Sequence, residues 1–247
     1  MTRPTAGPPH ILGQTGLGCI AGAVALPPDG PGWQAVRLSR NRNWGHPALV
    51  ESVRDLAGRA RAQGLPTLWI GDLGQPRGGP MPYGHSSHQA GLDADIWLDL
   101  SPKPAMTSAA REDVVVPSLV LPDGTGIDPA RWTPGHATLI RLAAELPGID
   151  RIFVNPAIKR ELCRGAAGAP WLRRVRPWRG HDSHMHLRLR CPPGQPDCRD
   201  QAPPPAGDGC DASLDWWLTP EARQPAPRGP GPAPRLPTAC RAVLEAR

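Results

Sequence analysis

The stretch Gly84–Trp97, which reads GHSSHQAGLDADIW, is the part of the sequence that decides the fold. It places two histidines and two acidic residues within eleven positions, from His85 to Asp95. From Leu92 onward apolar and polar residues alternate, which predicts a half-buried strand with Asp93 and Asp95 on its polar face. Carboxylates on one strand face, with histidines just ahead of them, fit one half of a metal site.

The matching half lies far downstream in the stretch His181–Arg190, which reads HDSHMHLRLR. The period is again two. His184 and His186 share a face with Arg188 and Arg190, while the residues between them are apolar. Two such strands can pair about 4.8 Å apart in one sheet, which would bring both sets of polar side chains together.

Composition indicates a globular chain with much irregular backbone. The 247 residues include 34 prolines and 28 glycines, yet 39% of the residues are apolar, enough for one substantial core. The net charge of +6 favours anionic partners such as nucleic acid or an acidic cell-envelope polymer. An arginine-rich composition produces the same charge without any such partner, so charge alone does not decide the function.

The six cysteines form no CxxC pair, which argues against a ribbon-type zinc site and allows three disulfides in an oxidising compartment. Fifteen connectivities are possible in principle. Cys191 and Cys198 flank a segment that must turn and are the favoured local pair, while Cys19 and Cys240 would tie the ends of the chain together. Six reduced, buried thiols are the less favoured alternative, because several cysteines lie in Pro/Gly-rich segments that we expect at the surface.

No run of eighteen apolar residues is present, so we expect no membrane-spanning helix. The segment Ile11–Leu26 resembles a signal-peptide core but is interrupted by glycines. Removing that segment would also discard Cys19 and leave an odd number of cysteines. We therefore interpret the chain as the mature form of an exported, periplasmic protein whose signal peptide is already absent.

Strands and helices are mixed without strict alternation, which predicts an α+β fold. Its central sheet is expected to be small and antiparallel, to carry the metal site, and to be flanked by helices and long Pro/Gly-rich loops stapled by disulfides. Helices are predicted to begin at Pro47, behind Thr133 and at Asn155-Pro156. We expect one domain over residues 1–247, with a flexible segment at 1–18 and a loop-rich region at 199–239.

At this point the motifs carry a family resemblance. His88-x6-Asp95 together with His184-x-His186 resembles the LAS group of zinc peptidases. The fuller match resembles the penicillin-insensitive murein endopeptidases and extends from about Gly18 to Cys240. It adds Gly71-Asp72, Gly78-Gly79, Gly84–Gln89, Gly91–Asp95, Phe153–Pro156 and His181-Asp182. The chain departs from that family at Tyr83, its only tyrosine, where we expect a small residue.

The resemblance implies one zinc ion per chain, bound by His88, Asp95 and His186. It implies His184 as the general base, with His181 and His85 beside the metal to orient water or stabilise the oxyanion. The implied reaction is hydrolysis of the D-alanyl–meso-diaminopimelyl cross-bridge of peptidoglycan by metal-activated water. Such a reaction is insensitive to β-lactams, in keeping with the lack of a Ser-x-x-Lys motif.

Two further assignments depend on the resemblance. Asp93 and Asp95 share a strand face, so spacing does not separate them; the family pattern favours Asp95 as ligand and leaves Asp93 to orient a histidine. The remaining disulfide, Cys163–Cys210, also agrees with the family.

Two alternatives come from other functional classes. The basic charge and the histidine cluster are compatible with a histidine-metal nuclease, although the cysteines and the His-x6-Asp pattern count against it, and we expect no nucleic-acid partner. A non-catalytic peptidoglycan-binding module with a structural zinc is the other alternative, which a fourth protein ligand would favour. Peptidoglycan cross-links are the expected partner in either peptidoglycan-directed case.

Overall fold

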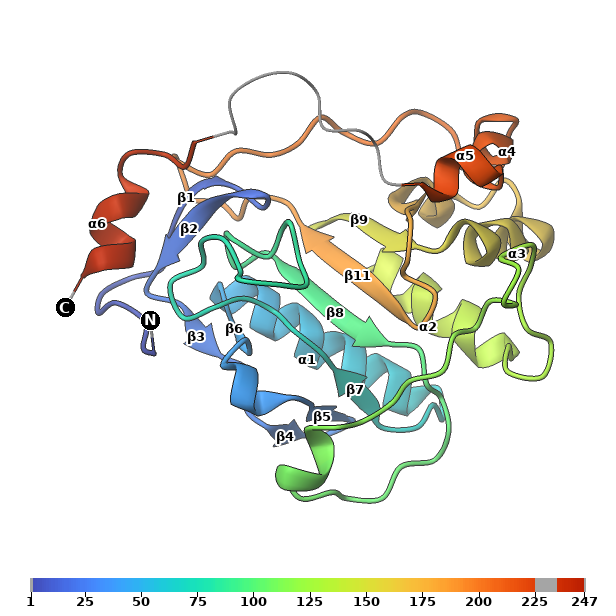
Figure 1. The fold of residues 1–247 in the computed structure, drawn as a ribbon, viewed down its shortest axis with the longest axis horizontal. Helices are drawn as coiled ribbons and strands as arrows, with labels where there is room; N and C mark the ends of the chain where they lie inside the picture. Colours follow the sequence, from blue (N-terminus) through green and yellow to red (C-terminus); the bar gives the residue numbers. More distant parts are fainter. Residues whose placement is uncertain (1, 225–234, 247) are drawn as a thin grey trace.

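The computed structural model describes residues 2–224 and 235–246. A seven-stranded mixed sheet with the order β10-β9-β11-β8-β7-β5-β4 forms the centre of the fold (Figure 1). Its strands are β4 (Asp29–Gly30), β5 (Trp33–Ala35), β7 (Leu68–Ile70), β8 (Asp93–Trp97), β9 (Ile149–Val154), β10 (Val175–Pro177) and β11 (His184–Leu189). Two small antiparallel sheets accompany it, formed by β1 (His10–Gln14) with β2 (Leu17–Ala21) and by β3 (Val24–Ala25) with β6 (Trp44–Gly45).

The prediction of an α+β fold is confirmed, but that of a small antiparallel sheet is wrong. The sheet is antiparallel from β9 through β11 and β8 to β7, and again between β5 and β4 at one edge. Strand β5 pairs parallel with β7, and β9 pairs parallel with β10, because a helical crossover returns the chain in each case. The strands β4, β5 and β10 have only two or three residues, too few to show a period in the sequence.

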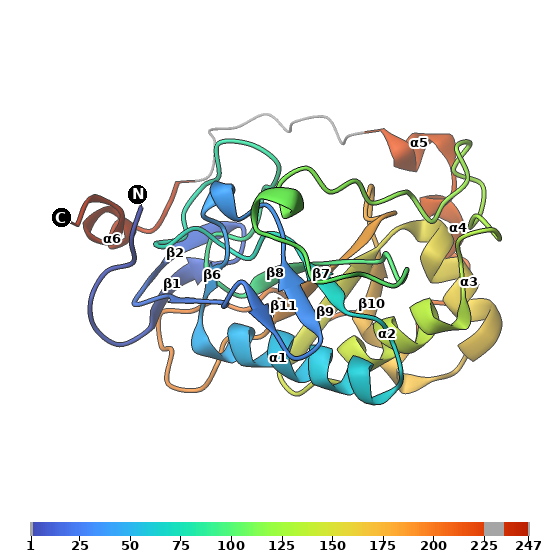
Figure 2. The ribbon, with the colours of Figure 1, turned by 90° about the horizontal axis from the view of Figure 1, so that it is seen from below.

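Three helices begin where the sequence predicts them. Helix α1 (Pro47–Ala62) is capped by His46, whose ring nitrogen accepts a hydrogen bond from the backbone of Ala48. Helices α2 (Pro134–Ala144) and α3 (Pro156–Ala166) likewise have proline at the first helical position. Figure 2 shows α1 and α2 along the same face of the central sheet. The 3-10 helices are η1 (Leu38–Arg40), η2 (Ala109–Arg111) and η3 (Pro170–Arg174).

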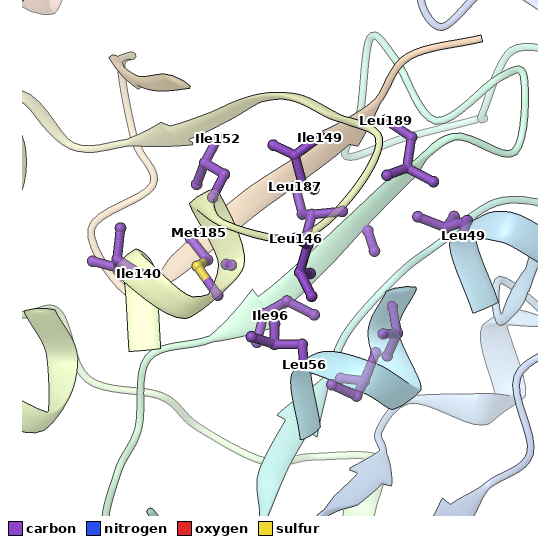
Figure 3. Packing of buried hydrophobic residues seen from close by; sticks show 14 of the residues in the cluster. Leu49, Leu56, Ile96, Ile140, Leu146, Ile149, Ile152, Met185, Leu187 and Leu189 are labelled. Carbon is purple, nitrogen blue, oxygen red and sulfur yellow. The ribbon is translucent and has the colours of Figure 1, made fainter. Parts of the chain in front are cut away.

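The apolar faces of β8 and β11 pack against α1 and α2 (Figure 3). Ile96, Met185 and Leu187 are completely buried there, as are Leu56 of α1 and Ile140 of α2. Each such side chain contributes about 1.5–3 kcal/mol by leaving water. The core therefore fixes the alternation of both strands and turns their polar residues to the opposite face.

The three expected disulfides, Cys19–Cys240, Cys163–Cys210 and Cys191–Cys198, are all present. The first joins β2 to helix α6 (Cys240–Glu245), so that the two ends of the chain lie together in Figure 1. Residues 1–18, predicted to be a flexible segment, contain strand β1 and the start of β2.

The region 199–239 contains helices α4 (Ser213–Trp217) and α5 (Pro220–Arg223), while its residues 225–234 lie outside the described part of the chain. Within residues 2–224 and 235–246, none of the helices is long and apolar enough to cross a membrane.

Candidate metal centre

Pairing of β8 with β11 brings the two sequence motifs together as predicted (Figure 1). In the antiparallel register His186 lies opposite Asp95 and His184 lies opposite Trp97. Because the apolar residues of both strands face the helices, these polar side chains gather on the other face. The remaining candidates come from the loop between β7 and β8 and from the residues just before β11.

Asp95 is the centre of the cluster. Its Oδ1 atom lies 3.4 Å from Nε2 of His88, 3.7 Å from Nε2 of His184 and 3.7 Å from Nδ1 of His186. Its Oδ2 atom lies 3.6 Å from Nε2 of His85. Asp95 is almost completely buried, and four imidazoles thus converge on one carboxylate.

His88 is held rigidly by its backbone. It has a φ of 63°, in the left-handed region that residues other than glycine seldom adopt. Its amide N–H donates to Oδ2 of Asp93 at 3.0 Å, and its ring Nδ1 pairs with the carbonyl of Leu73. The ring is completely buried, which leaves only Nε2 to face Asp95.

Asp93 lies beneath the cluster and orients His186. Its Oδ1 accepts hydrogen bonds from Nε2 of His186 at 2.8 Å and from Nε of Arg188 at 2.6 Å. Burial alone would raise the pKa of Asp93, but the adjacent Arg188 and His186 hold that pKa well below its usual value. Asp93 is therefore an anion whose position fixes the ring of His186 with Nδ1 toward Asp95.

Asp72, which follows β7, positions His85. Its Oδ2 lies 3.1 Å from Nε2 of His85 and accepts a hydrogen bond from the buried Arg42 at 2.9 Å. Arg42 in turn lies under the ring of Tyr83, 4.2 Å from its centroid. Periodicity does not identify Asp72 as part of the site; the signals are its place directly after a buried strand and the Gly71-Asp72 motif.

His181 and His184 form one wall of the centre, with ring centroids 4.9 Å apart. Nδ1 of His181 lies 2.7 Å from the carbonyl of Arg179, so it donates there and leaves Nε2 as an acceptor. Burial and the neighbouring His184 lower the pKa of His181 to about 4, so this ring is neutral near pH 7. Trp97 packs edge-on against His184 at 5.3 Å.

Several buried atoms of the cluster lack a hydrogen-bond partner within the described part of the chain, as expected of atoms that bind a metal ion. Nε2 of His88 and Oδ1 of Asp95 are buried and find no hydrogen-bond partner among the described residues. In a folded protein such atoms need a partner, and a cation between them would supply it. Burial opposes a charge on His88, yet the adjacent Asp95 raises its pKa to about 9, a further sign of a site built for positive charge.

Two ligand sets fit this geometry: His85, His88 and Asp95, or His88, Asp95 and His186. The donor atoms of His85, His88 and Asp95 lie within 4.8 Å of one another. His186 offers Nδ1 to the same Asp95 oxygen as His88 while its Nε2 donates to Asp93. Metal-binding histidines ordinarily donate their other ring nitrogen to a carboxylate or carbonyl, as His88 and His186 both do. Nε2 of His85 already faces Asp72, which favours His186 over His85 as the third ligand.

The cluster opens into a cavity of about 410 Å³. His85, His181 and His186 lie on its wall, together with the cations Arg151 and Arg188. A larger cavity, about 860 Å³, lies beside η3 and contains none of the candidate residues. The candidate residues therefore face the cavity of about 410 Å³.

Fold and cluster together define a protein with a candidate metal centre at the base of a cleft. The model of the family described as penicillin-insensitive murein endopeptidase, Peptidase_M74, matches residues 11–245. The chain belongs to this peptidase family.

Curated relatives of that name span almost the whole chain. The protein of Klebsiella pneumoniae subsp. pneumoniae is 45% identical over 99% of this chain and 89% of its own length. That of Haemophilus influenzae is 45% identical over 94% of this chain and 82% of its own length. That of Yersinia enterocolitica is 44% identical over 99% of this chain and 89% of its own length.

Proposed function

We propose that this protein is a zinc-dependent murein endopeptidase that acts in the periplasm on the peptide cross-links of the cell wall. The bond that we propose it hydrolyses is the D-alanyl–meso-diaminopimelyl amide. Membership of the family and the names of its relatives support the substrate class. The observation that carries the chemistry is the convergence of His88, His184 and His186 on one buried oxygen of Asp95.

The residues that would hold zinc are His88, Asp95 and His186. Both histidines are oriented by a hydrogen bond from the ring nitrogen that faces away from Asp95. When bound, zinc supplies Lewis acidity, which lowers the pKa of water to about 7 and polarises the scissile carbonyl. Three protein ligands leave a position open, as catalytic zinc sites require.

His184 is the proposed general base. Its Nε2 approaches Asp95, but its Nδ1 is buried without a hydrogen-bond partner in the described residues, unlike the corresponding atoms of His88 and His186. A ring without that anchor is less suited to hold a metal, and it can accept a proton from water and pass it to the leaving amine. General base catalysis of this kind contributes about 10²–10⁴-fold to the rate.

The two flanking histidines are proposed to act on water and on the developing charge. Nε2 of neutral His181 is an acceptor, which suits a role in orienting the attacking water. His85, held by Asp72 at the opposite side of the cluster, is proposed to help orient water or stabilise the developing negative charge. Because no serine is acylated in this scheme, β-lactams that acylate serine have no target.

The function is tested by incubating the purified protein with murein sacculi, with and without a chelator, and identifying the products by mass spectrometry. Zinc-dependent release of cross-link cleavage products is expected. Binding to sacculi without release would indicate a non-catalytic module, and cleavage of DNA in a parallel reaction would indicate a nuclease.

The ligand set is tested by metal analysis of five variants. His88→Ala, Asp95→Ala and His186→Ala are expected to lose zinc together with activity. His184→Ala is expected to keep close to one zinc per chain while its turnover falls about 10²–10⁴-fold. If His186→Ala keeps zinc and His85→Ala loses it, His85 is the third ligand in place of His186. If only His184→Ala loses zinc, His184 is the ligand and His186 the general base.

A further inference from the structure

Aromatic side chains form a continuous row that leads away from the candidate metal centre. The ring of Phe153 lies 5.3 Å from that of His186, and Trp178 lies 5.5 Å from Phe153. Trp217 follows at 5.5 Å from Trp178, and Trp216 at 5.2 Å from Trp217. We call these four residues, Phe153, Trp178, Trp217 and Trp216, the aromatic row.

Two rings of the aromatic row are open to water. Trp178 is 51% exposed and Trp216 is 52% exposed, which is unusual for such large apolar side chains. Helix α4 is anchored instead by Leu214, which is only 5% exposed. The exposed indoles therefore do little for the core, and exposed apolar groups that adjoin one another mark binding surfaces.

The aromatic row is also continuous with the cleft. Phe153 and Trp178 line the same cavity as His181 and His186. Trp217 lines a second, smaller cavity of about 120 Å³. A ligand bound at the metal centre can thus extend along the row without leaving the surface.

The length of the row indicates what part of a ligand its outer end would meet. Successive rings are 5.2–5.5 Å apart, so Trp216 lies at the fourth step from His186. An extended peptide covers at most about 3.3–3.6 Å per residue, so a stem of about four residues reaches roughly 14 Å. The inner rings lie within reach of the stem peptide, and the outer tryptophans lie where the sugar that carries it would begin.

We propose that Trp217 and Trp216 form a subsite for the N-acetylated sugars of the glycan strand, a proposal that rests on the proposed function. A pyranose ring presents a face of C–H groups, whose partial positive charge suits the negative face of an indole. The indole N–H suits the hydroxyl and amide groups at the edge of the sugar. The enzyme would then recognise a cross-link together with the glycan to which it is attached.

The test compares two ligands that lack the cross-bridge and so are not hydrolysed there: a disaccharide-tetrapeptide and the same tetrapeptide without sugars. Calorimetry is expected to show the wild-type protein binding the disaccharide form about tenfold more tightly. Trp216→Ala should weaken binding of the disaccharide form about fivefold and leave the tetrapeptide unchanged. Trp178→Ala should weaken binding of both ligands, because Trp178 lies within reach of the stem peptide. Val115→Ala removes another exposed apolar side chain and should change neither affinity.

Equal wild-type affinities, or no binding of either ligand, would overturn the proposal. So would an equal loss for both ligands in Trp216→Ala, which would assign the row to the peptide instead. Because these ligands report binding alone, sugar-dependent binding by a protein that fails to cleave sacculi would refute the proposed function and leave the subsite standing.

Discussion

Replacing Asp93 by asparagine is expected to weaken both the fold and the metal site. The carboxylate is completely buried and accepts hydrogen bonds from the backbone of His88, the ring of His186 and the guanidinium of Arg188. An amide keeps one acceptor oxygen but turns an NH2 group toward these donors. Arg188, only 6% exposed, would then lack a counter-charge within the core.

The magnitude follows from the cost of leaving one member of a buried ion pair alone, about 3–5 kcal/mol. Asp93→Asn should therefore lower the free energy of unfolding by about 3–5 kcal/mol. The measurement is urea unfolding followed by tryptophan fluorescence, in the presence of a chelator so that metal binding does not contribute. Without the chelator, its zinc affinity should fall about 10–100-fold, because His186 loses the acceptor that orients it.

A double-mutant cycle supplies the control. Arg188→Met alone should also be destabilising, since Asp93 keeps its charge with one cation fewer. Combining it with Asp93→Asn removes both charges, so the double variant should recover about 2 kcal/mol relative to the sum of the single losses. Additive losses, or a loss below about 1 kcal/mol for Asp93→Asn, would refute the argument that this pair is coupled and buried.

Two further predictions concern stability. Replacing Cys19 and Cys240 by serine opens a loop of 221 residues and should lower the free energy of unfolding by about 5 kcal/mol in the chain-entropy model. Replacing Cys191 and Cys198, which are 7 residues apart, should lower it by about 2 kcal/mol. Equal losses for the two pairs in urea unfolding would contradict the model. Lys159 is completely buried, and this burial lowers its pKa to about 8, so folding favours its neutral form. Below pH 8 the charged Lys159 therefore lowers the free energy of unfolding. This loss should disappear as the pH rises from 8 toward 10.5, the ordinary pKa of lysine, so that the free energy of unfolding gains up to about 3 kcal/mol. The difference in unfolding free energy between the wild type and Lys159→Met should rise between pH 8 and 10. A difference that does not change with pH would show that burial does not disfavour the charged form of Lys159.

The local features of this protein are determined by its sequence alone. The alternation in residues 92–98 and 184–190 identifies two strands and their polar faces, because a strand allows only two orientations of its side chains. Proline behind a capping residue locates the starts of α1, α2 and α3. The motifs within these elements were also enough to indicate the family to which the chain belongs.

Tertiary structure alone decides the features that depend on distant segments. The parallel pairing of β5 with β7 and of β10 with β9 depends on the helical crossovers that return the chain to the sheet. Spacing leaves Asp93 and Asp95 equivalent, whereas the fold places the Arg188 guanidinium and the His186 ring against Asp93. The rings of His88, His184 and His186 converge instead on Asp95. The contacts of Asp72 with His85 and of Trp178 with Trp217 join segments whose separation in the chain carries no signal. Period and capping act over a few neighbouring residues, while the environment of a charge or a ring is set by whatever the packed core brings beside it.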